Sequence, residues 1–422
     1  MHHVIIGQGP AGVIAAETLR QIDKDASITL IGNEHHAPYS RMAIPYYLTG
    51  NIKEDGTHLR HDPEHFQSLD IELVDGNVTQ IGLDAVTLEN GEHLNFDRLL
   101  IAAGSHAIRP PVPGIDLAGV ENCWTIQDAH AIAARAQKGC KVLLMGAGFI
   151  GCIVLEAMKA RGVELTIVEA QDRMVPRMMD ETGGKMIKDW CEAKGVKVLT
   201  GTLVKEIASS DDQLNVSFSQ GVMQAYDLVV CASGVQPNIA FLDGSGIETD
   251  DGILVDKYLR TNIKNIFAAG DIAQGPEFFS GKQEIHAIQP TASEHGRIAA
   301  LNMAGLETPY QGSLSMNVLS TLGLVSTSYG QWMGVAGGDE VIMADPERFK
   351  YIKLAFEGDV LVGALSLGFA AHPGVMRGLM QSKTRLGPWK DILMKEPTRL
   401  MEAWLACTQG GISQSMAEAA VA

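Results

Sequence analysis

Hydrophobic and polar positions at the start of the chain predict a strand, a helix and a second strand. The β-branched run at residues 4–6 is typical of a buried strand and is followed at once by the glycine-rich segment GQGPAG. The helical run Val13 to Gln21 comes next, and SITLIG then forms a second apolar run that ends beside Glu34. The pattern predicts a βαβ unit whose first turn is rich in glycine.

The glycines of this turn have the spacing G-x-G-x-x-G, which indicates a dinucleotide site. Glycine permits the tight turn and lets the backbone approach a pyrophosphate, whose charge lies at the positive N-terminus of the helix. Pro10 suits an early helical position because its N–H is not needed there, and Glu34 can accept hydrogen bonds from ribose hydroxyls. The candidate contact residues are Gly7, Gly9, Pro10, Ala11, Gly12 and Glu34.

The same order of elements returns in the segment KVLLMGAGFIGCIVLEAMKARGVELTIVEA. Strands are expected at Val142 to Met145 and at Leu165 to Val168, with a helix from about Phe149 to Arg161 between them. One such fingerprint is weak evidence, but two in their full context predict that the chain binds two dinucleotides. The second set of candidate contacts is Gly146, Gly148, Phe149, Ile150, Gly151 and Glu169.

Glu169 ends the last strand of this second repeat and bears on the choice of coenzyme. A carboxylate at that place accepts from a free ribose 2′-OH and repels a 2′-phosphate, so NADH is expected if the second dinucleotide is a nicotinamide coenzyme, as the family resemblance given below implies. Arg173 lies close enough in sequence to leave NADPH open as the less favoured coenzyme, although a structural ion pair is its more ordinary use.

Composition sets the broad class of the protein. The chain has 422 residues, 46% of them hydrophobic, which is enough for two or three domains with their own cores. Its formal net charge of -17 disfavours nucleic acid or an anionic membrane as a partner. No stretch resembles a secretion signal or a membrane-spanning helix, so we expect a cytoplasmic protein.

The six cysteines are scattered along the chain, without any C-x-x-C or C-x4-C pair. This spacing argues against an iron-sulfur site, a structural zinc or a dithiol redox pair. We expect no metal, and buried free thiols are the simplest interpretation.

Three further segments carry a resemblance to a known family. They are NIFAAGDIA, in which an apolar strand runs into Gly270 and Asp271, LLIAAGSHAIRPPVPG, and CASGVQPN. Together with the two fingerprints they resemble the pyridine nucleotide-disulfide oxidoreductases over nearly the whole chain. The resemblance implies that the first fingerprint binds FAD and the second NAD(P)H, with Asp271 near the ribityl and pyrophosphate groups. It adds Ala103, Gly104 and Gly270 to the FAD contacts and Gly234 to the NAD contacts.

The resemblance also implies the fold. We expect an α/β protein with two Rossmann-like dinucleotide-binding domains and a small α+β C-terminal domain. The expected FAD-binding domain is discontinuous and contains residues 1–112 and 238–310. The NAD(P)H-binding domain is expected at 113–237, the C-terminal interface or dimerisation domain at 311–410 and a mobile tail at 411–422.

Within the family, PYSRMAIPYYL is most similar to rubredoxin and ferredoxin reductases and to the flavin part of nitrite reductases. Those proteins carry a Tyr-x-Arg here, matched by Tyr39 and Arg41, and the arginine lies near the FAD pyrophosphate; a surface turn residue is the alternative for Arg41. Thiol-dependent members have a cysteine close to Met42, which this chain lacks. The flavin itself is therefore expected to carry the redox chemistry.

The segment IHAIQPTASEHGRIAALNMAG is expected to flank the flavin ring. A helix beginning near Thr291 would direct its N-terminal amides at the flavin N1 and C2 carbonyl. Gln289 and Thr291 are therefore FAD candidates. His286 is a weak candidate for a proton donor, and a packed histidine is the simpler interpretation.

Two departures from the family bear on the nicotinamide pocket. The usual glutamate after the second fingerprint is Ile153, and the usual lysine after Tyr-x-Arg is replaced by Tyr46 and Tyr47. Such changes are compatible with an altered or specialised pocket.

These observations predict an NADH-dependent FAD oxidoreductase that passes electrons to an iron-sulfur carrier or a partner redox subunit. Residues 377–399 contain six basic against two acidic residues, which suggests either a docking face for an acidic carrier, with Trp389 exposed, or a solvated helical face. In related enzymes the C-terminal domain forms a dimer interface or the acceptor face, so a homodimer is an open alternative. The other functions left open are an NADH oxidase that uses dioxygen and a non-catalytic flavin-bearing subunit.

Overall fold

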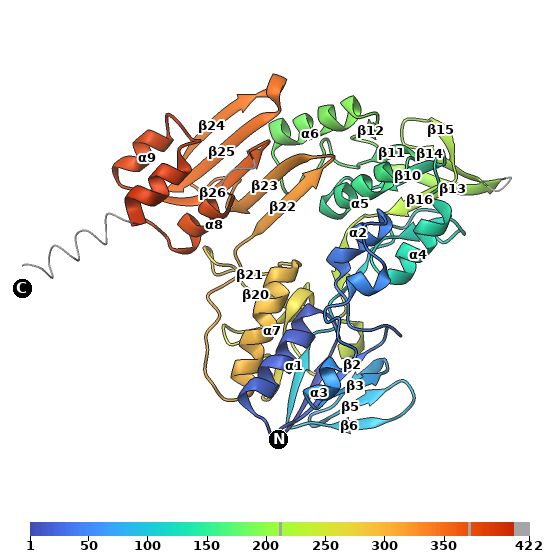
Figure 1. Cartoon of the computed structure of the whole chain (residues 1–422), viewed down its shortest axis with the longest axis vertical. Helices are drawn as coiled ribbons and strands as arrows, with labels where there is room; N and C mark the ends of the chain where they lie inside the picture. The colour runs from blue at the N-terminus through green and yellow to red at the C-terminus, as the bar shows by residue number, and fades with distance from the viewer. Residues whose placement is uncertain (211–212, 370–372, 409–422) are drawn as a thin grey trace, which may run out of the picture. The chain divides into compact units, whose positions relative to one another are not determined.

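The computed structural model describes residues 1–210, 213–369 and 373–408, which form two compact units (Figure 1). Unit 1 contains Met1–Pro110, Glu121–Ala134 and Ser233–Ser313. Unit 2 contains Pro111–Val120, Arg135–Ala232 and the described residues from Leu314 onward. The mobile tail predicted at 411–422 lies outside the described residues.

Unit 1 is built on a parallel five-stranded sheet in the order β19-β7-β1-β2-β3. Its central strands are apolar and buried in a core that also takes residues from two helices and from the segment 78–88. The strands are β1 (His2–Ile6), β2 (Ser27–Gly32), β3 (Ile71–Asp75), β7 (Arg98–Ile101) and β19 (Ile266–Ala268).

Two helices pack side by side on this sheet, α1 (Pro10–Ile22) and α7 (Gln289–Met303) (Figure 1). They approach closely because small residues line the contact. A Cβ at Gly296 would lie 2.1 Å from the carbonyl oxygen of Ala11. Each of the two segments expected to contact FAD includes the N-terminus of one of these helices. The two expected contact segments are therefore held together by the packing of α1 on α7.

The remaining elements of unit 1 are short. One antiparallel sheet contains β4 (Val78–Ile81), β5 (Ala85–Leu88) and β6 (His93–Asn95), and a second small sheet contains β18 (Ile253–Leu254), β20 (Ala273–Pro276) and β21 (Gln283–Glu284). Strand β8 (Ser105–Ala107) pairs with β17 (Val235–Pro237). The short helices and 3-10 turns are α2 (Ile44–Leu48), α3 (His65–Ser68), α4 (Ile126–Arg135), η1 (Arg41–Ala43), η2 (Glu54–Thr57), η3 (Ala240–Leu242) and η4 (Gly270–Ile272).

A second sheet, in the order β12-β11-β10-β16-β9, belongs to unit 2 except for Glu121 and Asn122 of β9. Its strands are β9 (Val120–Asn122), β10 (Lys141–Met145), β11 (Glu164–Val168), β12 (Lys197–Leu199) and β16 (Leu228–Cys231). The helices are α5 (Phe149–Ala160) and α6 (Glu181–Ala193), and β13 (Val204–Ser210), β14 (Gln213–Phe218) and β15 (Met223–Tyr226) form an antiparallel sheet. The parallel strands of both units confirm the predicted α/β class with two Rossmann-like nucleotide folds.

The C-terminal part of unit 2 is an antiparallel sheet in the order β22-β23-β26-β25-β24 (Figure 1). The strands are β22 (Met316–Thr321), β23 (Leu324–Gly330), β24 (Asp339–Asp345), β25 (Lys350–Glu357) and β26 (Val360–Leu367), with the 3-10 turn η5 (Pro346–Arg348). Helices α8 (Pro373–Gln381), α9 (Pro388–Leu393) and residues 400–408 follow. In the part of the chain that the structure describes, no helix is both long and apolar enough to cross a membrane.

Candidate active site

Two glycines of the first fingerprint are required by the chain itself. Gly7 has φ +114°, a region that other residues rarely adopt, and a Cβ there would lie 2.1 Å from the carbonyl oxygen of Ala102. A Cβ at Gly12 would lie 1.9 Å from the carbonyl oxygen of Gly7. These residues form the tight turn between β1 and α1 and bring helix and strand together.

Gly9 is different, because neither its backbone nor its neighbours require glycine. It is the N-cap of α1 with φ -76°, and a Cβ there would meet no described atom within 4 Å. The open space lies at the helix N-terminus, where backbone N–H groups point out of the helix and favour an anion. A dinucleotide diphosphate accounts for glycine at this position, so the residues present fit FAD.

The second fingerprint repeats this arrangement. Gly146 has φ +101°, and a Cβ at Gly151 would lie 2.0 Å from its carbonyl oxygen. Gly148 caps α5 with φ -75° and again has open space where a Cβ would be. The residues of this turn therefore fit the diphosphate of a second dinucleotide.

Glu169 is held at the end of β11 next to this turn. It is 9% exposed, and its carboxylate accepts from the backbone N–H of Ala147 at 2.8 Å and of Gln171 at 2.9 Å. A carboxylate has further lone pairs with which to accept from a ribose hydroxyl. Arg173 is engaged by Asp172 at 2.7 Å and by the carbonyl of Met179 at 3.1 Å, as expected for its structural role.

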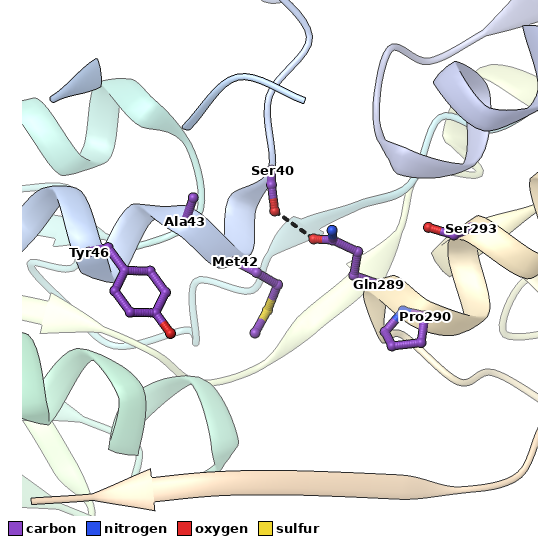
Figure 2. A pocket seen from close by; sticks show the side chains of 7 residues that line it. All are labelled: Ser40, Met42, Ala43, Tyr46, Gln289, Pro290 and Ser293. Carbon is purple, nitrogen blue, oxygen red and sulfur yellow. Dashed lines mark hydrogen bonds between the residues drawn. The ribbon is translucent and has the colours of Figure 1, made fainter. Parts of the chain in front are cut away.

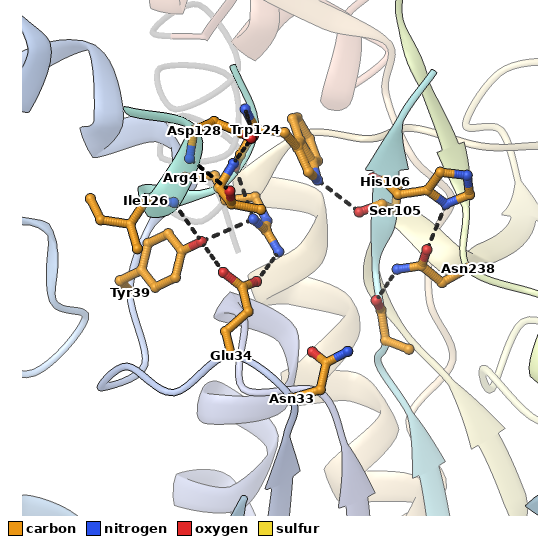
Figure 3. A network of polar contacts seen from close by, with 12 residues as sticks. Asn33, Glu34, Tyr39, Arg41, Ser105, His106, Trp124, Ile126, Asp128 and Asn238 are labelled. Carbon is orange, nitrogen blue, oxygen red and sulfur yellow. Dashed lines mark hydrogen bonds and ion pairs between the residues drawn. The ribbon is translucent and has the colours of Figure 1, made fainter. Parts of the chain in front are cut away.

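Figure 3 shows the polar network around Arg41 in unit 1. Its Nη2 donates to Glu34 at 2.6 Å, and its Nη1 donates to the hydroxyl of Tyr39 at 3.0 Å and to the carbonyl of Trp124 at 2.9 Å. Tyr39 in turn donates to Glu34. The network brings together the two residues predicted from separate motifs, Glu34 and Arg41, while the contact of Arg41 with FAD stays a prediction.

Asp271 lies in η4, directly after β19. The hydroxyl of Ser105 donates to its carboxylate at 2.8 Å, and burial raises its pKa. Gly270 before it has φ +78°, so glycine is needed for the turn. The carboxylate is thus fixed within unit 1 with acceptor capacity left for a ligand hydroxyl.

Three more candidates, Ala103, Gly104 and Gly234, lie just before the paired strands β8 and β17. Asn238 donates from its side chain to the carbonyl of Ala103 at 2.7 Å, and its backbone N–H donates to the carbonyl of Gly104 at 3.0 Å. Gly234, which the resemblance assigns to NAD, belongs to unit 1, where its carbonyl accepts from Ile108 at 2.9 Å.

Helix α7 begins at Gln289, two residues before the predicted start, because Pro290 suits the first helical turn. A pocket of about 440 Å³ lies beside this N-terminus (Figure 2). Across it the hydroxyl of Ser40 donates to the side-chain oxygen of Gln289 at 2.5 Å. The lining residues are Ser40, Met42, Ala43, Tyr46, Gln289, Pro290 and Ser293. The pocket joins the Tyr-x-Arg segment to the segment expected to flank the flavin.

His286 is not placed as a ready acid. Its side chain is 8% exposed, its Nε2 lies 3.8 Å from Glu284, and its buried Nδ1 has no partner among the described residues. Burial lowers its pKa, so the ring is neutral at pH 7. His295 on α7, which the sequence analysis did not select, is also buried, and burial lowers its pKa to about 4.

Three of the six basic residues near the C-terminus pair with acids of the same chain. Lys390 pairs with Asp339 at 2.5 Å and Arg385 with Asp359 at 3.5 Å. Arg399 contacts Glu396 and lies 5.5 Å from the ring centre of Trp389, which is half-buried. This pairing supports a solvated face more than a docking surface.

Sequence reasoning missed Trp124 and Ser105, which contact Arg41 and Asp271. A signal for the first was present: Thr125 and Asp128 form a T-x-x-D capping box at the start of α4. That box fixes the residue before it, since Asp128 also accepts from the backbone N–H of Trp124 at 2.9 Å.

Within the described ranges, no group of three or more His, Cys, Asp or Glu residues is arranged to hold a metal.

Residues 1–296 match the family described as pyridine nucleotide-disulphide oxidoreductase. Among curated proteins, the chain is 28% identical over 400 residues to the NADH-dependent phenylglyoxylate dehydrogenase subunit epsilon of Aromatoleum evansii, covering 94% of this chain and 95% of that one. It is 33% identical over 317 residues to rhodocoxin reductase of Rhodococcus erythropolis, covering 74% of each.

A solved structure gives the same picture. The NAD-dependent persulfide reductase from A. fulgidus superposes with a TM-score of 0.85 at 28% identity, over 92% of this chain and 78% of that one. The chain therefore belongs to the pyridine nucleotide-disulphide oxidoreductase family, and it is an oxidoreductase that works with FAD and NADH.

Proposed function

We propose that the protein oxidises NADH and passes the electrons through FAD to an iron-sulfur carrier protein or a partner redox subunit. Bound FAD supplies the chemistry, because it accepts two electrons from a nicotinamide and releases them singly. The chain has to bind both dinucleotides, orient them and stabilise charge.

The observation that carries the proposal is the absence of a thiol from the segment that lines the pocket. Met42, 46% exposed, lies there, and residues 37–50 contain no cysteine. Cys123 is buried, and burial raises its pKa to about 12, so it is not a thiolate at neutral pH. Unit 1 therefore offers no thiolate that could relay electrons from a bound flavin.

Each dinucleotide has a separate group of residues to position it. We assign the FAD diphosphate to the turn at Gly9 and its ribose to Glu34, and the NADH diphosphate to the turn at Gly148 and its ribose to Glu169. The N-terminus of α7, beginning at Gln289, would present backbone N–H groups to the ring of a bound flavin and would there stabilise negative charge. No protein acid or base is needed for hydride transfer itself.

The acceptor class is inferred from the relatives. A relative that is 28% identical over 397 residues is named the ferredoxin–NAD(+) reductase component of a dioxygenase, and subunit epsilon is named as one subunit of a dehydrogenase. The chain covers 95% of subunit epsilon, so a comparable role as the NADH-reacting subunit of a complex is compatible with its length.

The proposal is tested by comparing acceptors in steady state. The purified protein, with NADH in excess, is supplied with dioxygen alone, with a [2Fe–2S] ferredoxin or with a rubredoxin. We expect at least about tenfold faster NADH oxidation with an iron-sulfur carrier, because docking aligns the electron donor and acceptor. An equal rate with dioxygen alone would indicate an NADH oxidase, and no oxidation with any acceptor would leave a non-catalytic flavin-bearing subunit.

A further inference from the structure

Arg41 is oriented with part of its guanidinium free. A guanidinium has five N–H donors, and the contacts with Glu34, Tyr39 and Trp124 engage three of them, on Nη1 and Nη2. The Nε–H and one further Nη2–H have no partner among the described residues, and the side chain is 34% exposed. Such a group is prepared to bind an anion in two-pronged fashion.

Trp124 fixes this orientation in two ways. Its carbonyl accepts from Arg41 at 2.9 Å, and the guanidinium carbon lies 5.3 Å from the centre of its ring, with the ring of Tyr39 at 5.6 Å (Figure 3). A cation close to an aromatic face is attracted by the ring and loses much of its freedom. These contacts restrict the orientation of the Arg41 guanidinium.

The other end of the indole is tied to the second part of the expected FAD site. Its Nε1–H donates to the carbonyl of Ser105 at 2.7 Å, and the hydroxyl of the same serine donates to Asp271 at 2.8 Å (Figure 3 shows the first contact). Trp124 thus contacts both Arg41 and the residue that orients Asp271. The capping box of α4 holds Trp124 itself in place.

We propose that Trp124 is a positioning residue for FAD, which sets Arg41 for the diphosphate and keeps Ser105 and Asp271 in register with it. The proposal deepens the proposed function and rests on FAD binding by unit 1. It concerns the indole side chain, since the carbonyl contact to Arg41 remains in any substitution.

The test measures the dissociation constant of FAD, from the fluorescence of released flavin, for Trp124→Ala, Trp124→Phe, Arg41→Ala and the double variant Trp124→Ala/Arg41→Ala. We expect Trp124→Ala to weaken binding about tenfold, the combined effect of one hydrogen bond and one cation–π contact. Trp124→Phe keeps a ring beside Arg41 and should recover part of that loss. In the Arg41→Ala background the effect of Trp124→Ala should be clearly smaller, because the two residues act together.

Trp190→Phe is the matched control. Trp190 also donates its indole N–H to a backbone carbonyl, Thr321 at 3.1 Å, and has a cation, Lys194, 4.6 Å from its ring centre, but it belongs to unit 2. Its substitution should leave the FAD dissociation constant unchanged. NADH binding, measured on every variant, should also be unchanged and thereby report intact folding of unit 2.

Two results would overturn the inference: FAD affinity of Trp124→Ala equal to that of the unsubstituted protein, or an equal loss with and without Arg41. The unsubstituted protein separates this failure from failure of the proposed function. If it retains FAD and is reduced by NADH while the Trp124 variants bind FAD normally, only the positioning role fails. If it does not retain FAD, the proposed function itself fails.

Discussion

At the scale of single residues, the glycines of the two fingerprints divide into two kinds. Gly12 and Gly151 are glycine because the protein's own backbone occupies the position of a Cβ, 1.9 and 2.0 Å away. Gly9 and Gly148 have open space there and an ordinary φ. The sequence motif does not distinguish these two kinds of glycine. The structure shows which glycines are needed to form the turn and which leave room for a ligand.

The variants Gly148→Ala and Gly151→Ala should therefore fail differently. Gly148→Ala should raise the KM for NADH about tenfold or more while FAD content and melting temperature stay the same, because the methyl group occupies space needed by the diphosphate. Gly151→Ala should instead destabilise the protein by about 1–3 kcal/mol, because the new methyl collides with a carbonyl oxygen. Stopped-flow reduction by NADH and thermal melting measure the two effects; normal NADH kinetics in Gly148→Ala would contradict the assignment of this turn.

At the scale of elements, β1 contains a histidine in a fully buried position. His3 is 0% exposed, pairs with Ile28 and Arg98 in the neighbouring strands, and has no partner for either ring nitrogen among the described residues. Burial lowers its pKa from 6.5 to about 4. The unfolded chain therefore binds a proton at mildly acidic pH that the folded chain excludes, and stability is lost as pH falls from about 6.5 toward 4.

His3→Leu should flatten this pH dependence. For the unsubstituted protein, His3 should cost about 2 kcal/mol of stability between pH 7 and pH 5, from the difference between its folded and unfolded pKa. The leucine variant should lose this part of the change, as seen in the urea midpoint at each pH. His61→Leu, at an exposed position, is the control and should behave like the unsubstituted protein. If His3→Leu left the pH dependence of the urea midpoint unaltered, the pKa of His3 would be the same in the folded and the unfolded protein, which would contradict the prediction.

Most elements near the dinucleotides could be predicted from the sequence, because strand, glycine turn and helix are local patterns. The expected strands at β1, β2, β10 and β11 agree with the structure to within two residues. Strand β24 was missed because its acidic and exposed positions give no buried run, as is usual at a sheet edge. The side-chain network was not predictable for a different reason: Trp124 and Ser105 are 83 and 64 positions from Arg41, and only the fold brings them together.

At the scale of the whole molecule, the C-terminal sheet and the second nucleotide fold belong to one unit. The indole of Trp190 on α6 donates to the carbonyl of Thr321 at 3.1 Å, and the hydroxyl of Tyr351 donates to Asp180, which also caps α6. The division into three domains expected from the sequence stays a prediction. The contacts within unit 2 join segments far apart in the chain, and a local sequence pattern cannot predict such contacts.

The whole chain is also expected to work without a reactive thiol. Cys123, Cys152, Cys191 and Cys231 are buried, and only Cys140 and Cys407 are partly exposed. Burial raises the pKa of Cys191, as of Cys123, to about 12. Iodoacetamide at pH 7.5 should therefore label at most Cys140 and Cys407 and leave the rate of NADH reduction unchanged. The double variant Cys140→Ser/Cys407→Ser should take up no label, and loss of activity on labelling of a buried cysteine would contradict a thiol-free mechanism.

The most direct measurement is an anaerobic titration of the FAD-loaded protein with NADH, followed by the visible flavin spectrum. A flavin acting alone takes up two electrons, so we predict complete bleaching at about one NADH per FAD. Uptake of two NADH per FAD would reveal a second redox group, such as a thiol pair. No bleaching, with FAD bound, would show that the protein does not use NADH to reduce its flavin and would contradict the account.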